Sequence, residues 1–151
     1  MIKGEDFSVT RAKVRDFKEI KKIQESGYGE VFWKSFDLWL ERLLSSKEYL
    51  IHYQGKVVGF IHVEPKDVFT LHILNFCLYR EYQGIGLGTA VLGWVKEEYR
   101  AKGYREVTLL VREGNEYVIN FYKGNGFIEY GRKKGYYRDT KEDAIKMVSS
   151  V

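Results

Sequence analysis

Residues 68–89, VFTLHILNFCLYREYQGIGLGT, carry the pattern that decides the fold. The apolar run from Val68 to Tyr79 predicts a long strand buried on both faces. A glycine-rich turn from Gln83 to Gly88 follows, and it opens a predicted helix that ends near Lys102. The first turn of a helix offers unpaired N–H groups with partial positive charge, and glycines let the backbone approach an anion closely. The stretch therefore predicts a phosphate-binding turn in the middle of the chain.

Two common phosphate-binding classes do not fit this turn. A dinucleotide-binding fingerprint needs a first strand near the start of the chain and an acidic residue about 20 residues later. A Walker loop needs Gly-Lys-Ser/Thr after its glycines, whereas Thr89 follows Gly88 directly here. The turn belongs to neither class.

Working outward from the turn, hydrophobic periodicity predicts the remaining elements. Before it we expect strands over 7–13, 49–53 and 57–63, and helices over 14–26 and about 35–45. After it we expect strands over 106–112, 127–132 and about 143–148, and a helix over 116–123. The order β-α-α-β-β-β-α-β-α-β-β predicts a mixed α/β layer sandwich in a single domain over residues 1–151.

The composition limits the classes of ligand and partner that we expect for this chain. The net charge is +4, but acidic and basic residues interleave, as in Lys96-Glu97-Glu98-Tyr99-Arg100. This argues against a nucleic-acid partner and suits a polyanionic small ligand. Cys77 is the single cysteine, which excludes an internal disulfide and a cysteine zinc cluster. No apolar run approaches the roughly 20 residues of a membrane span, so we expect a cytoplasmic protein with no membrane partner.

The turn and its downstream context resemble the GNAT family of N-acetyltransferases. The family loop, Gln/Arg-x-x-Gly-x-Gly/Ala, is matched by Gln83, Gly86 and Gly88, and Asn115, Phe121-Tyr122 and Gly126-Phe127 follow at the family's distance. The resemblance spans residues 5–149. It implies a mainly antiparallel central sheet with helices on both faces, and direct acetyl transfer from acetyl-CoA to an amine without a metal. It is compatible with a monomer or a homodimer.

The resemblance also implies a coenzyme-binding set. The loop would hold the pyrophosphate of coenzyme A through backbone amides of Gly84, Ile85, Gly86, Leu87, Gly88 and Thr89, beside Gln83. The pantetheine arm would lie along Phe76, Cys77 and Leu78, where this strand and the next one splay apart. Asn115 and Asn120 would give further contacts to the arm, although Asn115 is also a favoured helix N-cap. Cys77 itself we interpret as a buried structural thiol.

Two residues are candidates for the chemistry. Tyr122 stands where the family has its general acid, and a phenol with pKa near 10 suits protonation of a thiolate with pKa about 8.5. The alternative is a tyrosine of the core. His72 stands at a position where relatives carry a base, and imidazole is a sensible base near neutral pH. The alternative is a strand histidine held by a backbone carbonyl.

At one position where relatives carry a base, this chain departs from the family. Other relatives carry Glu or His on the strand after the loop helix, where this chain has Leu110. That departure removes one standard base of the family. Glu64, His62 and a water chain remain alternatives.

The C-terminal stretch points to the acceptor. Tyr136-Tyr137, Glu142-Asp143-Ala144 and Met147 resemble the tail of ribosomal-protein alanine acetyltransferases and related protein N-terminal acetyltransferases. The resemblance implies that Tyr136 and Tyr137 hold the first residues of an acceptor peptide, with Tyr28 as the opposite wall. The alternative is that the two tyrosines cover a sheet edge.

The acceptor class stays open at this stage. A protein α-amine with pKa about 7.7–8.0 is partly neutral at pH 7, whereas a lysine ε-amine near 10.4 is almost fully charged. This favours a protein or peptide N-terminus. An acetyltransferase for small amines (polyamine, amino acid or antibiotic) and a non-catalytic acyl-CoA-binding domain are the alternatives.

Overall fold

The computed structural model describes residues 6–27 and 36–151. The described strands are β1 (Phe7–Arg11), β2 (Lys47–Tyr53), β3 (Lys56–Pro65), β4 (Thr70–Leu78), β5 (Glu106–Arg112), β6 (Ile128–Lys133) and β7 (Ala144–Ser150). The helices are η1 (Val14–Asp16), α1 (Phe17–Gly27), α2 (Phe36–Ser45), η2 (Arg80–Tyr82), α3 (Leu87–Ala101) and α4 (Glu116–Gly124). The predicted element order is confirmed, with two short 3₁₀ helices in addition.

The seven described strands hydrogen-bond in the order β1-β2-β3-β4-β5-β7-β6. The pairs β1–β2, β2–β3, β5–β7 and β6–β7 are antiparallel, and β4–β5 is parallel. A mixed α/β fold with a mainly antiparallel sheet is therefore confirmed. The chain groups into two compact units, unit 1 (Met1–Glu64 and Leu74–Gly93) and unit 2 (Pro65–Ile73 and Trp94–Val151). The single domain predicted over residues 1–151 stays a prediction.

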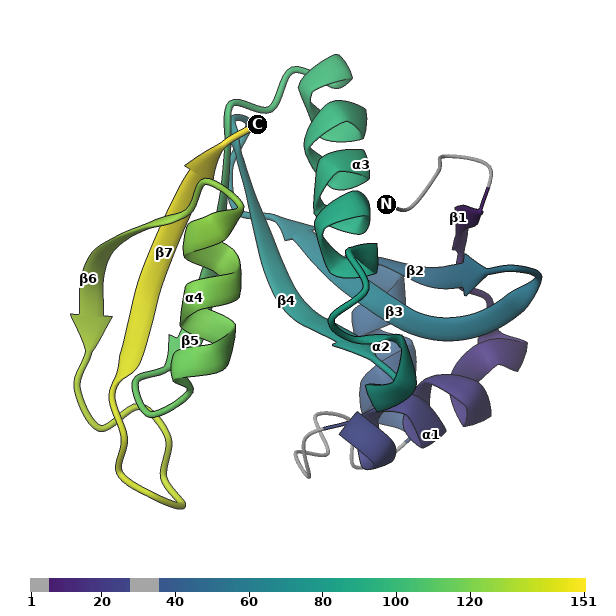
Figure 1. Ribbon diagram of the computed structural model, residues 1–151, viewed down its shortest axis with the longest axis horizontal. Coiled ribbons are helices and arrows are strands. Elements are labelled where there is room, and N and C mark those ends of the chain that lie inside the picture. The colour runs from purple at the N-terminus through teal and green to yellow at the C-terminus, as the bar shows by residue number, and fades with distance from the viewer. Residues whose placement is uncertain (1–5, 28–35) are drawn as a thin grey trace. The chain divides into compact units, whose positions relative to one another are not determined.

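In unit 1, two amphipathic helices pack on a sheet (Figure 1). Ile20 and Ile23 of α1 and Trp39 of α2 are completely buried. They form one apolar cluster with Leu50 of β2, Phe60 of β3, and Ala12 and Cys77. The helical spacing of the apolar positions thus does what the sequence predicts, because it puts one face of each helix on the core.

In unit 2, β7 pairs with β5 on one side and with β6 on the other, and α4 lies beside these strands (Figure 1). Val107, Leu109 and Val111 of β5 are buried, as is Thr108 between the first two. Lys96, in the second half of α3, donates hydrogen bonds of 2.8 Å to the Asn125 carbonyl and to the Ser149 hydroxyl. Its ammonium also lies 5.1 Å from the Phe127 ring centroid. These contacts attach α3 to the end of α4 and to β7.

Two expectations about the long central strand were wrong. The strand begins at Thr70, and Val68 and Phe69 are 77% and 46% exposed. The reason is a turn held by Asp67, whose Oδ1 accepts the N–H groups of Phe69 and Thr70 at 2.8 Å each. Full burial also fails from Leu74 to Phe76, which are only half-buried. Hydrophobicity alone did not reveal either feature, since both runs are largely apolar.

Candidate active site

The glycine-rich turn has the conformation that its sequence predicts. Gly84 and Gly86 adopt positive φ angles of 75° and 90°, a region that other residues rarely adopt. Leu87 then begins α3, and the Gly86 carbonyl accepts the Ala90 N–H at 3.1 Å. The amides at this helix start have no carbonyl one turn earlier to bond to. A Cβ added to Gly84 would meet no atom within 4 Å, so the turn is open to a ligand. This geometry fits a bound pyrophosphate.

Polar and aromatic contacts fix the turn within unit 1. The Gln83 side-chain amide donates to the Leu78 carbonyl at 3.0 Å, which ties the loop to the end of β4. Tyr82 makes an edge-to-face contact with Tyr53, with ring centroids 6.0 Å apart. The Tyr79 hydroxyl donates to Glu19 of α1 at 3.2 Å. In this structure the Gln83 side chain therefore positions the loop.

The C-terminal half of β4 lies beyond the ladder that this strand forms with β5. The parallel ladder of β4 with β5 covers three residue pairs, from Thr70↔Glu106 to His72↔Thr108. Phe76, further along β4, is half-buried, while Cys77 and Leu78 are buried. The Cys77 thiol donates to the Ile23 carbonyl at 3.6 Å, and burial raises its pKa to about 11. Cys77 is thus a protonated, structural thiol, as predicted.

Tyr122 lies on α4 and is 7% exposed. Its ring makes edge-to-face contacts with Phe121 and Phe127, with centroids 5.1 and 5.3 Å away. Asn115 is the N-cap of α4, because its side chain accepts the Val118 N–H at 3.3 Å. Asn120 is exposed on the same helix. Tyr122 is thus a buried side chain packed against two aromatic rings.

His72 is half-buried on β4, and its Nδ1 lies 2.8 Å from the Thr108 hydroxyl. Burial lowers the pKa of His72 to about 4, and the charges of Lys66 and Lys133 act in the same direction. The imidazole is therefore neutral at neutral pH and weakly basic. Leu110, two residues after Thr108 on β5, supplies no ionisable group.

The two alternative bases are engaged elsewhere. His62 is completely buried, and its Nε2 is hydrogen-bonded to the Ser46 hydroxyl. Glu64 forms an ion pair with Arg42 at 3.2 Å. Burial in one case and pairing in the other argue against proton abstraction by either residue.

The predicted acceptor tyrosines lie on the connection between β6 and β7. Tyr136 is 49% exposed and Tyr137 is half-buried. Their rings meet edge to face, with centroids 5.1 Å apart. Arg112 lies 4.0 Å from the Tyr137 ring centroid. Tyr28, the third predicted acceptor residue, is outside the described residues.

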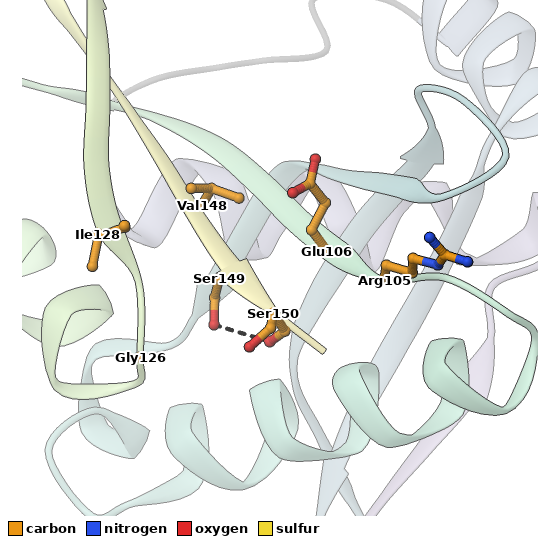
Figure 2. Close-up of a pocket in the computed structure, with 7 residues that line it drawn as sticks. All are labelled: Arg105, Glu106, Gly126, Ile128, Val148, Ser149 and Ser150. Carbon is orange, nitrogen blue, oxygen red and sulfur yellow. Dashed lines mark hydrogen bonds between the residues drawn. The ribbon is translucent and has the colours of Figure 1, made fainter.

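An open pocket of about 320 Å³ lies in unit 2 away from these residues (Figure 2). Its lining residues are Arg105, Glu106, Gly126, Ile128, Val148, Ser149 and Ser150. The Ser149 hydroxyl donates to the Ser150 carbonyl at 3.0 Å, and it accepts from Lys96. Glu106 and Arg105 extend away from that hydroxyl in Figure 2. None of the predicted catalytic, coenzyme-binding or acceptor residues lines the pocket, although Gly126 belongs to the family motif.

The predicted site residues fall into two sets. The loop and β4 positions from Phe76 to Thr89 belong to unit 1. His72, Tyr122 and the remaining predicted residues that the structure describes, Asn115, Asn120, Tyr136 and Tyr137, belong to unit 2. Among the described residues, no group of His, Cys, Asp or Glu could hold a metal ion. No helix in residues 6–27 or 36–151 has both the length and the apolar character to cross a membrane.

Comparison with known proteins agrees with this geometry. Residues 14–127 match the model of the acetyltransferase (GNAT) family. An N-alpha-acetyltransferase of Sulfurisphaera tokodaii is 30% identical over 99% of this chain and 96% of its own. A ribosomal protein bS18-alanine N-acetyltransferase of Escherichia coli is 32% identical over 75% of this chain and 81% of its own.

The fold comparison gives the same result. The crystal structure of Ard1 from Thermoplasma volcanium superposes with a TM-score of 0.84 at 24% identity, covering 97% of this chain and 98% of that one. The sequence match shows the family, and the superposition shows the shared fold. The chain therefore belongs to the GNAT acetyltransferase family and is an N-acetyltransferase that uses acetyl-CoA.

Proposed function

We propose that this N-acetyltransferase acts on the α-amine at the N-terminus of a protein or peptide. The observation that carries the proposal is the Tyr136–Tyr137 pair, which stands partly exposed on the β6–β7 connection. Rings in this position suit the backbone and first side chains of an extended peptide. The related proteins from Sulfurisphaera tokodaii and Escherichia coli, which carry names of α-amine and alanine acetyltransferases, support the same acceptor class.

Acetyl-CoA, when bound, supplies the acetyl group as a thioester. In this proposal, backbone amides from Gly84 to Thr89 bind its pyrophosphate. Main-chain groups of Phe76, Cys77 and Leu78 bind its arm, and an N–H group near Leu78 polarises the acetyl carbonyl. Positive φ at Gly84 and Gly86 supports the first role, since it turns the chain into the start of α3. The ladder of β4 with β5 runs only from Thr70↔Glu106 to His72↔Thr108, so the main chain of Phe76, Cys77 and Leu78 lies outside it. This supports the second role.

His72 or an ordered water is the proposed base. An attacking amine becomes more acidic as its nitrogen bonds to carbon, so a weak base is sufficient to take the proton at that stage. The pKa of about 4 at His72 keeps its ring neutral throughout the neutral range. An α-amine also has a neutral fraction at pH 7, because its ordinary pKa is about 7.7–8.0. A strong carboxylate base at Leu110 is therefore not needed for this acceptor.

Tyr122 is the proposed acid. Its hydroxyl would donate a proton to the departing thiolate, and a phenol with pKa near 10 is a suitable donor for a thiol of about 8.5. The flanking Phe121 and Phe127 rings support this role, because they hold the Tyr122 ring in place within α4. Transfer is direct, from coenzyme to amine within one ternary complex.

The test combines calorimetric titration with acetyl-CoA and an assay of thiol release. The acceptors are short peptides that contain an internal lysine and have a free N-terminus, the same peptides with a blocked N-terminus, and spermidine. Release only with free N-termini would support the proposal. Release with spermidine and not with peptides would contradict the proposal and identify the enzyme as a small-amine acetyltransferase. Equal release with blocked and free peptides would show that the acceptor is a lysine side chain.

A further inference from the structure

Arg112, the last residue of β5, is the centre of a contact network in unit 2. Its two terminal nitrogens bond to the two carboxylate oxygens of Asp139 at 3.0 and 3.1 Å. It also donates to the Thr140 hydroxyl at 3.2 Å and lies 3.5 Å from Glu142. Its guanidinium lies 4.0 Å from the centroid of the Tyr137 ring. One side chain thus contacts the β6–β7 connection at four residues.

The same connection is attached to the start of α4. Glu142, which pairs with Arg112, accepts the Gly114 N–H at 3.0 Å. Gly114 directly precedes Asn115, the N-cap of the helix that carries Tyr122. A Cβ at Gly114 would lie 2.5 Å from the Glu142 carboxylate, so a larger residue there would displace that side chain. A fixed connection is therefore also fixed relative to α4.

Only arginine can make both kinds of contact. A guanidinium is planar, so it stacks on a ring while its edge makes a two-point bond to a carboxylate. A lysine ammonium keeps the charge but has neither the plane nor the fork. The hydrogen bond from Arg112 also lowers the pKa of Asp139, and hydrogen bonds from Thr140 and Gly114 lower that of Glu142. The carboxylates of the network thus stay ionised at neutral pH.

We propose that Arg112 is a positioning residue for the acceptor: it fixes the Tyr137 ring, and with it the Tyr136–Tyr137 pair, for peptide binding. This inference rests on the proposed function, because it assigns the acceptor site to these tyrosines. Arg112 touches neither reacting group in this scheme. Its effect is on the KM for the acceptor, not on the chemical step.

The experiment compares Arg112→Lys with a matched control, Arg105→Lys. Arg105 also stacks on a ring, with its guanidinium 4.2 Å from the Phe69 centroid, but it lies outside the β6–β7 connection. Arg112→Lys should raise the KM for the acceptor peptide about tenfold, which corresponds to about 1.4 kcal/mol. The KM for acetyl-CoA and kcat should stay unchanged, and Arg105→Lys should leave all three constants unchanged.

A second variant tests the same contact in case Arg112→Lys does not fold. Asp139→Asn leaves Arg112 and Tyr137 in place, weakens the two-point bond and lies on an exposed segment. It should raise the acceptor KM in the same direction. Hydrogen exchange of residues 136–143 reports on the tether independently of activity, and it should accelerate in both variants and not in Arg105→Lys.

The outcomes separate this inference from the proposed function. A wild-type enzyme that acetylates peptides, with an acceptor KM unmoved by Arg112→Lys and Asp139→Asn, overturns the role of Arg112. A parallel rise in the KM for acetyl-CoA also overturns it, because the effect is then structural. A wild-type enzyme that acetylates only small amines contradicts the proposed function, and an unchanged small-amine KM in Arg112→Lys then overturns the positioning role too.

Discussion

At the scale of single residues, the surroundings of Tyr122 and His72 bear on the roles proposed for them. Tyr122 is 7% exposed and is flanked by two phenylalanine rings. His72 keeps a neutral ring because burial and two lysines disfavour its charged form. The proposed base is therefore unprotonated at neutral pH, as its role requires.

Replacement of Tyr122 by Phe should lower kcat by about a hundredfold, the range typical of a lost general acid. The ring contacts with Phe121 and Phe127 remain, so the fold and the affinity for acetyl-CoA should not change. Steady-state kinetics and calorimetry measure the two effects. Tyr117→Phe, on the same helix at a position 63% exposed, is the control. An unchanged rate in Tyr122→Phe would remove Tyr122 from the mechanism.

Replacement of His72 by Gln tests the base through pH dependence. Because the pKa of His72 is about 4, the base is unprotonated above that pH, and wild-type kcat/KM should show no inflection near the ordinary value of 6.5. The main rise should instead follow the acceptor amine, near pH 7.7–8.0. The variant should be slower by about a hundredfold at every pH above 5. Equal rates in both proteins would leave ordered water as the base.

At the scale of elements, β3 approaches β4 closely at Gly59. A Cβ at Gly59 would lie 2.4 Å from the Cys77 carbonyl oxygen and 2.5 Å from Leu78 Cδ2. The Tyr79 N–H bonds to the neighbouring Val58 carbonyl at 2.9 Å. The absence of a side chain at Gly59 therefore sets the path of the β4 residues that are proposed to bind the coenzyme arm.

Replacement of Gly59 by Ala should push β4 away from β3. We expect a loss of about 1 to 3 kcal/mol in the free energy of unfolding, as for an overpacked core. Binding of acetyl-CoA should weaken as well, since the main chain at Cys77 and Leu78 is displaced. Denaturant titration and calorimetry measure both quantities.

The control for this substitution is Gly93→Ala. Gly93 is exposed within α3, and a Cβ there meets no atom within 4 Å. Alanine is a better helix former than glycine, so this variant should gain about 1 kcal/mol in stability. A Gly59→Ala variant as stable as wild type, with unchanged affinity for acetyl-CoA, would contradict the importance of the close approach.

At the scale of the whole molecule, a buried pair should contribute to the dependence of stability on pH. Glu48 and His62 are directly opposite each other on β2 and β3, and both are completely buried. Glu48 accepts the Trp39 indole N–H at 2.7 Å, but its second oxygen has no hydrogen-bond partner among the described residues. Burial raises the pKa of Glu48 from 4.5 to about 7 and lowers that of His62 from 6.5 to about 4.

The two groups act in opposite directions. Between pH 4.5 and 7 the folded chain keeps a proton on Glu48 that the unfolded chain has lost, so stability falls as pH rises through this range. Between pH 6.5 and 4, His62 is protonated in the unfolded chain but not in the folded chain, so stability falls as pH decreases. His72, whose pKa burial also lowers to about 4, acts in the same direction as His62, so the pH of greatest stability should lie closer to neutrality than the Glu48–His62 pair alone would give.

Replacement of Glu48 by Gln removes the first effect and keeps an acceptor for the Trp39 indole. At pH 8 the variant should be more stable than wild type by up to about 3 kcal/mol, while at pH 5 the two should be similar. Urea denaturation at both pH values measures the difference. Glu98→Gln, at a surface position paired with Lys102, should show no such pH dependence. A variant destabilised equally at both values would refute the assigned ionisation of Glu48.

The sequence by itself determined the element order, the glycine turn and the family. These properties are local: apolar spacing sets each helix or strand, and Gly84 and Gly86 are where the chain needs positive φ. The motif around Tyr122 also needed no structure. The limits of β4 were missed, because the turn that Asp67 forms with Phe69 and Thr70 competes with a strand that hydrophobicity favours.

Only the tertiary structure decided which distant residues meet. Arg112 reaches Tyr137 and Asp139, and Glu48 stands opposite His62, because strand register brings together residues far apart in the chain. The pKa of His72 likewise depends on its burial and on Lys66 and Lys133 nearby. A sequence pattern gives the period of an element but not its partner, and the energies of contact, burial and charge depend on the partner.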